Sequence, residues 1–254
     1  MQTRDQLAAR EPLLTSRLSG GLWVPGDGIV YAPNVARWFI EDAGITHLHD
    51  RALSVDAPYV TLRSRKRVRA RAIVIACGLG ANRLLDENWL WAKNGQLAIT
   101  DRYGPLLSHQ LVELGYGASA HAGGTSVAFN IQPRPTGQLL IGSSRQFDNT
   151  DREIDLPLLA TMLARARHFL PSLESLNIIR CWSGFRAASA DGNPLIGPHP
   201  TRPGVWLALG HEGLGVTTAP ATAELLSAQI LGERPAVSLN AWLPARLYKQ
   251  EAIA

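Results

Sequence analysis

The hydrophobic pattern changes its period along the chain and predicts α/β segments around an antiparallel block. Apolar residues at Val35, Trp38 and Phe39 have helical spacing, so a helix is predicted over residues 33–44. The run Ile73–Ile75 is short, continuous and β-branched, which is typical of a strand buried on both faces of a parallel sheet. Further strands are predicted at Ile45–Leu48, Tyr59–Leu62, residues 177–182 and Val205–Leu209.

The middle of the chain follows a different pattern. Three segments alternate between apolar and polar residues and are separated by Gly/Pro turns: GQLAIT (95–100), TSVAFNIQPRP (125–135) and GQLLIGSSRQF (137–147). Alternation of this kind predicts an antiparallel sheet. An amphipathic helix is predicted next, over residues 155–171 and ended by Pro171. Because α/β segments flank this block on both sides, one domain is predicted to interrupt another.

A glycine-rich turn joins the last predicted strand to a long helix, in GVWLALGHEGLGVTTAPATAELLSAQILG (204–232). The predicted helix is Ala221–Leu231, with Gly232 as its C-cap. The glycines of the turn let the backbone approach a ligand or adopt positive φ, and the free amides at a helix start favour an electron-rich or anionic partner. A tight turn without a ligand explains these glycines equally well.

Arg186 is the candidate ligand-binding side chain of the preceding segment, residues 183–197, which is predicted to be a loop. Small residues flank it in the sequence GFRAAS and leave space around the guanidinium. Arginine is suited to hold a carboxylate through two parallel hydrogen bonds. A surface arginine, or one paired with Asp191, is the alternative of equal weight.

Composition places the chain among ordinary globular proteins. It has 254 residues, 46% hydrophobic and 18% charged, enough for one large domain or two intertwined ones. No apolar run approaches the roughly 20 residues of a membrane helix, and the polar start is unlike a signal peptide. We therefore expect a cytoplasmic protein, or one attached to a membrane only through a partner.

The candidate metal ligands do not form a site. Cys77 and Cys181 lack metal-ligand spacing and are predicted to be buried thiols. The two histidines of HLH (47–49) have no third ligand nearby.

The net charge is +4, and much of the positive excess lies in RSRKRVRAR (63–71). Such a cluster suits a phosphate or nucleic-acid site. We favour a solvated hairpin, because no aromatic residues interleave with the charges as stacking on single strands requires. Its inner positions would be Val60, Leu62, Val68 and Ala70.

Five segments, in chain order, resemble the FAD-dependent amine and amino-acid oxidoreductases of the D-amino-acid oxidase, glycine oxidase and sarcosine oxidase type. They are DGIVYAPNVARWFIEDA, ARAIVIACGLGANRLL, NIQPRPTGQLLIGSSRQF, WSGFRAASADGNPLIGP and LALGHEGLGVTTAPATAELLSAQILG. The resemblance implies an α/β (α+β) fold in which a partial FAD-binding Rossmann-type domain is interrupted by an antiparallel-sheet substrate domain. It implies a substrate domain of residues 1–30 and 86–185, and the remaining part of the FAD-binding domain in residues 31–85 and 186–254.

The same resemblance implies a function and a set of site residues. The activity would be oxidation of the CH–NH bond of an amino acid or related secondary amine, by hydride transfer to the flavin. Arg186 would bind the substrate carboxylate, and no side chain is required as a catalytic base. The residues implied to line the flavin are Ala76, Cys77, Gly78, Gly210, His211, Gly213, Leu214, Gly215, Val216 and Thr217. We expect non-covalent FAD, because the cysteine that links flavin in some sarcosine oxidases aligns with Gly184.

One part of the family pattern has no match in this sequence. The family begins with a βαβ unit carrying G-x-G-x-x-G, which holds the ADP half of FAD, and nothing here corresponds to it. Two explanations are open: the sequence is a fragment or has a lost start, or another chain supplies the unit. The alternative function is therefore a catalytically incomplete remnant or scaffold subunit that cannot hold FAD alone. Nucleic-acid binding through residues 63–71 ranks last, and the substrate and the electron acceptor, oxygen or a quinone-linked partner, stay open.

Overall fold

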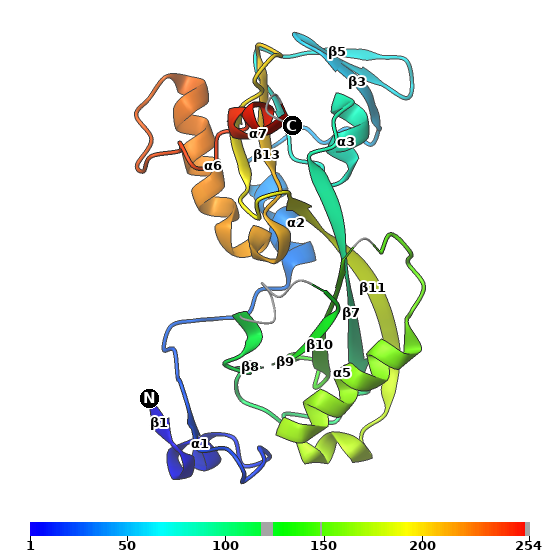
Figure 1. Ribbon diagram of the computed structural model, residues 1–254, viewed down its shortest axis with the longest axis vertical. Coiled ribbons are helices and arrows are strands. Elements are labelled where there is room, and N and C mark those ends of the chain that lie inside the picture. The colour runs from blue at the N-terminus through cyan, green and yellow to red at the C-terminus, as the bar shows by residue number, and fades with distance from the viewer. Residues whose placement is uncertain (118–123, 148, 252–254) are drawn as a thin grey trace. The chain divides into compact units, whose positions relative to one another are not determined.

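The computed structural model describes residues 1–117, 124–147 and 149–251 (Figure 1). The chain divides into two compact units, each assembled from two stretches of sequence: Met1–Tyr31 with Asn94–Phe185, and Ala32–Lys93 with Arg186–Ala254. The boundaries fall inside strands β7 (Leu90–Thr100) and β11 (Ile178–Ser189). The fold is mixed α/β with an antiparallel sheet, as the hydrophobic pattern predicts, and the roles of the two units stay predictions.

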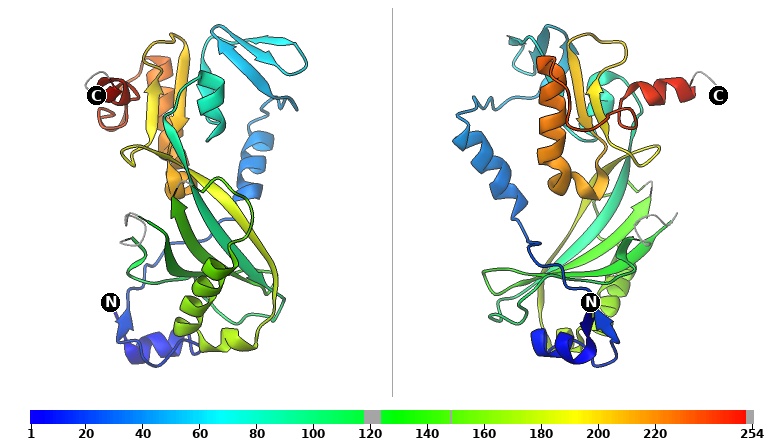
Figure 2. Two further views of the ribbon diagram at one scale, coloured as in Figure 1. Left: turned by 45° about the vertical axis from the view of Figure 1, so that its right-hand side comes forward. Right: turned by 90° about the vertical axis from the view of Figure 1, so that its left-hand side faces the viewer.

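The first unit is built on the predicted antiparallel sheet. Its strand order is β11-β7-β10-β9-β8, with β8 (Leu111–Val112), β9 (Ser126–Pro133) and β10 (Leu139–Phe147) pairing antiparallel. Helix α5 (Leu156–Phe169) covers one face of the sheet (Figure 2). The helix and the sheet both contribute apolar residues to one buried cluster. The side chain of Asp155 caps α5 by accepting the Leu158 N–H at 2.9 Å. A 3-10 turn, η1 (Pro171–Ser175), follows the helix at the predicted proline.

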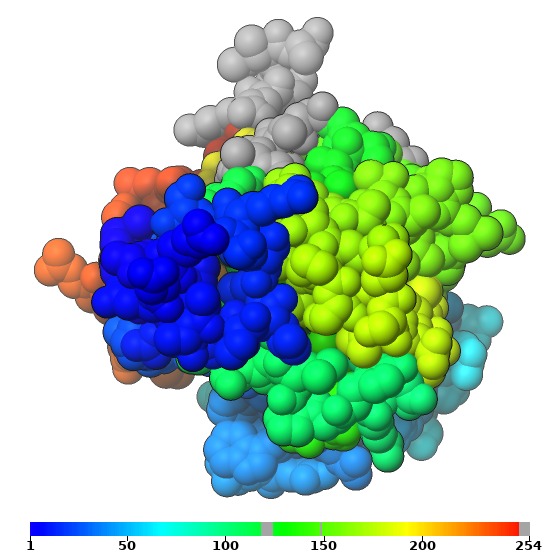
Figure 3. Space-filling model, turned by 90° about the horizontal axis from the view of Figure 1, so that it is seen from below, coloured from blue at the N-terminus to red at the C-terminus, as the bar shows by residue number. Residues whose placement is uncertain are grey.

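Three short elements at the N-terminus had no clear periodicity and were not predicted. They are β1 (Gln2–Thr3), α1 (Arg4–Arg10) and β2 (Gly20–Gly21). The Thr3 and Gln6 side chains form a capping box that begins α1. Figure 3 shows this segment beside the end of α5, where the Thr15 N–H donates to the Phe169 carbonyl at 2.9 Å.

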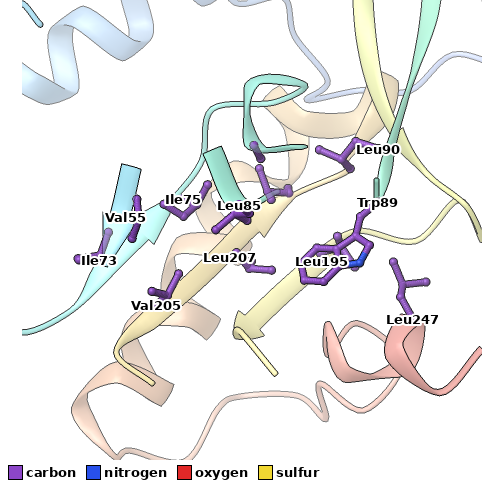
Figure 4. Packing of buried hydrophobic residues seen from close by; sticks show 12 residues of the cluster. Val55, Ile73, Ile75, Leu85, Trp89, Leu90, Leu195, Val205, Leu207 and Leu247 are labelled. Carbon is purple, nitrogen blue, oxygen red and sulfur yellow. The ribbon is translucent and has the colours of Figure 1, made fainter. Parts of the chain in front are cut away.

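The second unit contains the parallel strand pair. Strand β13 (Val205–Leu209) pairs parallel with β6 (Ile73–Ile75) and antiparallel with β12 (Leu195–Pro198). Figure 4 shows the core that forms around these strands, with α3 (Gly80–Leu85) contributing Leu85. The prediction that β6 is buried on both faces is wrong, because Val74 is 45% exposed. Alternation along a strand points Val74 away from the side on which Ile73 and Ile75 are buried.

A three-stranded antiparallel sheet carries the basic segment. It consists of β3 (Ala52–Asp56), β4 (Tyr59–Leu62) and β5 (Arg67–Arg69), and Val60 pairs with Val68 as the hairpin prediction requires. Helix α2 (Ala32–Asp42) is present close to its predicted bounds. The predicted strand Ile45–Leu48 is wrong: these residues have no strand pairing, and both end residues are more than half exposed.

Three further expectations need correction. Residues 183–189 of the predicted loop 183–197 are the end of β11, so Arg186 lies on a strand, and residues 195–197 belong to β12. Helix α6 (Gly215–Leu231) begins six residues before the predicted start and contains Pro220, while Gly232 is its C-cap with φ +74°. The thiols are not buried: Cys77 is exposed and Cys181 is partly exposed. The last helix is α7 (Ala245–Glu251), and within the described residues no helix is long and apolar enough to cross a membrane.

Candidate flavin and substrate site

The glycine-rich turn begins where β13 ends. Gly210 has φ +74°, and a Cβ there would approach Leu90 Cδ2 and Ser189 Cβ at 3.4 Å. Positive φ and close neighbours together explain why this position is a glycine. A single 3-10 turn, η2 (Glu212–Leu214), then leads directly into α6.

His211 ties the turn to the elements on either side. Its backbone forms an isolated bridge with Ala188 of β11, and its Nε2 is hydrogen-bonded to Thr222 Oγ1 of α6 at 2.9 Å. Burial lowers the pKa of the His211 imidazole, so the ring is neutral at neutral pH. The histidine is therefore a fixed part of the turn, not a source of charge.

Glu212 ties the turn to β7. The Lys93 Nζ donates to Glu212 Oε2 at 3.2 Å, and both side chains are mostly buried. Neither this pair nor the His211–Thr222 bond was found from the sequence. Lys93 lies 119 residues from its partner, and a lone lysine on a strand gives no local signal.

Arg186 lies against the same turn. Its Cδ and Nε are both 3.8 Å from the position that a Cβ on Gly213 would occupy, so the absence of a side chain at Gly213 leaves room for the arginine. The alternative partner, Asp191, is bound by Arg246, whose Nε donates to Asp191 Oδ2 at 2.6 Å. The Arg246 guanidinium holds the pKa of the Asp191 carboxyl well below its ordinary range.

The start of α6 has no side-chain cap. Its N-cap residue, Leu214, makes no side-chain capping hydrogen bond, and the first turn carries no acidic residue. Free backbone N–H groups and the positive end of the helix dipole therefore meet at Gly215, Val216 and Thr217. Leu214 and Val216 are exposed, so their side chains leave apolar surface beside these amides.

A groove of 430 Å³ brings the start of α6 together with the end of β6. Ala76, His211 and Gly215 line it, and most of its other lining residues are small or apolar: Val74, Ala208, Ala219, Thr222, Ala223, Leu226, Ser227 and Ile230. Cys77 and Gly78 follow directly in the chain without lining the groove, and a Cβ on Gly78 would meet no atom within 4 Å. Small residues and apolar walls fit a flat ring system such as flavin, and amides at a helix start suit the hydrogen-bond-accepting carbonyl oxygens of that ring.

A parallel strand pair, a glycine turn and a helix without a side-chain cap thus lie together, in a chain that also carries an antiparallel sheet. The sequence profile of the FAD dependent oxidoreductase family matches residues 1–229. The chain belongs to this family.

Named relatives agree with this assignment. Glycine oxidase from Geobacillus kaustophilus is 29% identical over 241 residues, which cover 89% of this chain and 60% of that protein. The crystal structure of glycine oxidase from Geobacillus kaustophilus superposes with a TM-score of 0.80 at 26% identity, covering 95% of this chain and 65% of that one. An opine oxidase subunit from Agrobacterium tumefaciens is 27% identical over 190 residues, 73% of this chain and 46% of that protein. The chain thus spans less than two thirds of the length of these relatives.

Proposed function

We propose that this chain takes part in the FAD-dependent oxidation of the CH–NH bond of an amino acid or a related secondary amine. The observation that carries the proposal is the contact between Arg186 and the turn that begins α6. The arginine suits a carboxylate, the turn suits a flat ring with hydrogen-bond-accepting carbonyl oxygens, and the two lie side by side.

Arg186 is the substrate-binding residue of this proposal. Its guanidinium binds the substrate carboxylate through two parallel hydrogen bonds and so fixes the orientation of the Cα–H and the amine. Because β11 is a long, paired strand, the arginine is held on a rigid element. The amine enters neutral, so no side-chain base is needed to remove a proton from it.

The residues that hold the flavin in this proposal come from the two loops beside the groove. The turn 210–217 contributes backbone amides and small residues, and Ala76, Cys77 and Gly78 contribute the neighbouring loop after β6. When bound non-covalently, FAD supplies the two-electron acceptor for hydride from the substrate carbon. Water then hydrolyses the released imine to a carbonyl product and an amine or ammonia.

The ADP half of FAD needs a further binding element. In Rossmann-type folds it lies on a βαβ unit with G-x-G-x-x-G, a motif that this sequence does not contain. Among the described residues β6 pairs on one side only, with β13, so its other edge is open to a parallel strand. We propose that such a unit, from a longer polypeptide or a partner subunit, completes the site in the cytoplasm or at a membrane-bound partner.

Reconstitution tests the proposal. The purified protein is titrated with FAD, alone and with candidate partner chains, and the loaded sample is mixed anaerobically with a panel of amino acids and secondary amines. We expect a yellow protein whose visible flavin band is bleached by at least one substrate with a carboxylate. Protein that stays colourless under every condition would leave only the alternative, a remnant or scaffold subunit that does not hold FAD.

A further inference from the structure

We propose that Lys93 and Glu212 form a positioning pair that fixes the flavin-facing turn, an inference that rests on the function proposed above. The pair joins the end of the β7 segment in the second unit to the middle of the turn, with Lys93 Nζ donating to Glu212 Oε2 at 3.2 Å. Lys93 lies outside the segments that carry the family resemblance, and neither residue contacts the substrate in the proposal. Their role is to hold the backbone that carries the ligand-facing amides.

The backbone of Glu212 gives the first reason. Glu212 has φ +49°, in the left-handed region that glycine adopts freely and that glutamate rarely adopts. The same turn places glycine at 210 and 213, so glycine at 212 would relieve this strain. A strained backbone conformation persists when the surrounding structure determines it. The strain at Glu212 therefore indicates that the glutamate side chain contributes to holding the turn.

The environment of the ion pair gives the second reason. The two side chains are only 16% and 18% exposed, so solvent screens their attraction weakly. A partly buried pair has a defined geometry, because either charge without the other would be poorly solvated. The pair is thus able to hold the strained turn in place. A fully exposed ion pair contributes too little stability to do so.

The position of the pair gives the third reason. Glu212 lies between His211, which is bonded to Thr222 of α6, and Gly213, which lies against Arg186. Movement of Glu212 would therefore shift both the start of α6 and the surface that Arg186 contacts. We infer that Lys93 sets the distance between the carboxylate-binding arginine and the amides at the start of α6.

Four variants separate this role from a general effect on folding. Lys93→Met and Glu212→Gln each remove one charge, and Lys93→Arg keeps the charge. Glu212→Gly removes the carboxylate and the backbone strain together. The matched control is Glu41→Gln, which breaks the exposed pair between Arg37 and Glu41 on α2.

The first readout needs no flavin. Amide ¹H–¹⁵N resonances of Gly213 and Gly215 are recorded in the full chain, together with thermal unfolding. We expect Lys93→Met, Glu212→Gln and Glu212→Gly to shift or broaden both resonances, with Lys93→Arg and Glu41→Gln close to wild type. Unchanged Gly213 and Gly215 resonances in Glu212→Gly or Lys93→Met, in a folded protein, would overturn the inference.

The second readout is FAD affinity, measured by quenching of flavin fluorescence. We expect about tenfold weaker binding or more in the three variants that break the pair, and near wild-type affinity in Lys93→Arg. If wild type binds FAD and Lys93→Met binds it equally well, the inference is wrong. If wild type does not bind FAD, the proposed function fails, and the glycine resonances still decide whether the pair fixes the turn.

Discussion

At the scale of single residues, the candidate site combines features that the sequence reveals with contacts that it hides. The glycines of the 210–215 turn and the small neighbours of Arg186 could be recognised because glycine spacing reports backbone freedom. The bonds from His211 to Thr222 and from Glu212 to Lys93 could not, since each depends on how separate elements pack. The placement of Arg186 beside Gly213 likewise required the path of β11.

His199 provides a prediction at this scale. Its side chain is buried, its Nδ1 accepts the Thr201 N–H at 3.2 Å, and its ring packs against Trp89. Burial lowers the pKa of His199 from 6.5 to about 4. Between these two values the unfolded state binds a proton that the folded state does not, so stability falls as the pH decreases across this range. As the pH falls from 6.5 to about 4, protonation of His199 in the unfolded state should lower the wild-type free energy of unfolding by up to about 3 kcal/mol.

Urea unfolding at a series of pH values checks the His199 prediction. His199→Gln removes the titrating group, so its free energy of unfolding should depend less on pH between about 6.5 and 4. His47→Gln, at an exposed position, serves as the matched control and should keep the wild-type dependence. A His199→Gln protein with the full wild-type pH dependence would show that another group is responsible.

At the scale of helices and strands, periodicity predicted the elements whose apolar faces are buried. The antiparallel strands β9 and β10, the helix α5 and the parallel strand β6 all belong to this group. Predictions failed where apolar residues are exposed, as in Ile45–Leu48, because pattern alone does not say whether a partner is present. The strand through residues 183–189 was missed because it is rich in small residues, which resemble a loop in composition.

The end of α6 provides a prediction at this scale. Gly232 has φ +74°, and its N–H donates to the carbonyls of Ala228 and Gln229, so it ends the helix as a left-handed C-cap. Gly232→Ala should lower the free energy of unfolding by about 1 kcal/mol, because alanine is strained in this region. Thermal or urea unfolding measures the change. Gly28→Ala is the control, because Gly28 does not have a positive φ and a Cβ at either glycine meets no atom within 4 Å. An equal loss in both variants would contradict the explanation.

At the scale of the whole molecule, two interleaved units account for the change of pattern along the chain. A central antiparallel block between α/β segments was enough to predict that one unit interrupts the other, but not where β7 and β11 pass from one unit to the next. Arg186, the glycine turn and the loop after β6 all lie in the second unit. The candidate site within that unit can therefore be tested without assuming how the two units are arranged.

The proposed function depends most on Arg186 and the turn at the start of α6 serving one ligand site. The direct measurement is a titration of the FAD-loaded protein with a simple carboxylate, followed through the visible spectrum of the flavin, in wild type, Arg186→Met and Arg186→Lys. We predict a saturable spectral change in wild type, about 30-fold weaker or lost binding in Arg186→Met, intermediate binding in Arg186→Lys, and unchanged FAD affinity in all three. Equal carboxylate affinity in wild type and Arg186→Met would contradict the account.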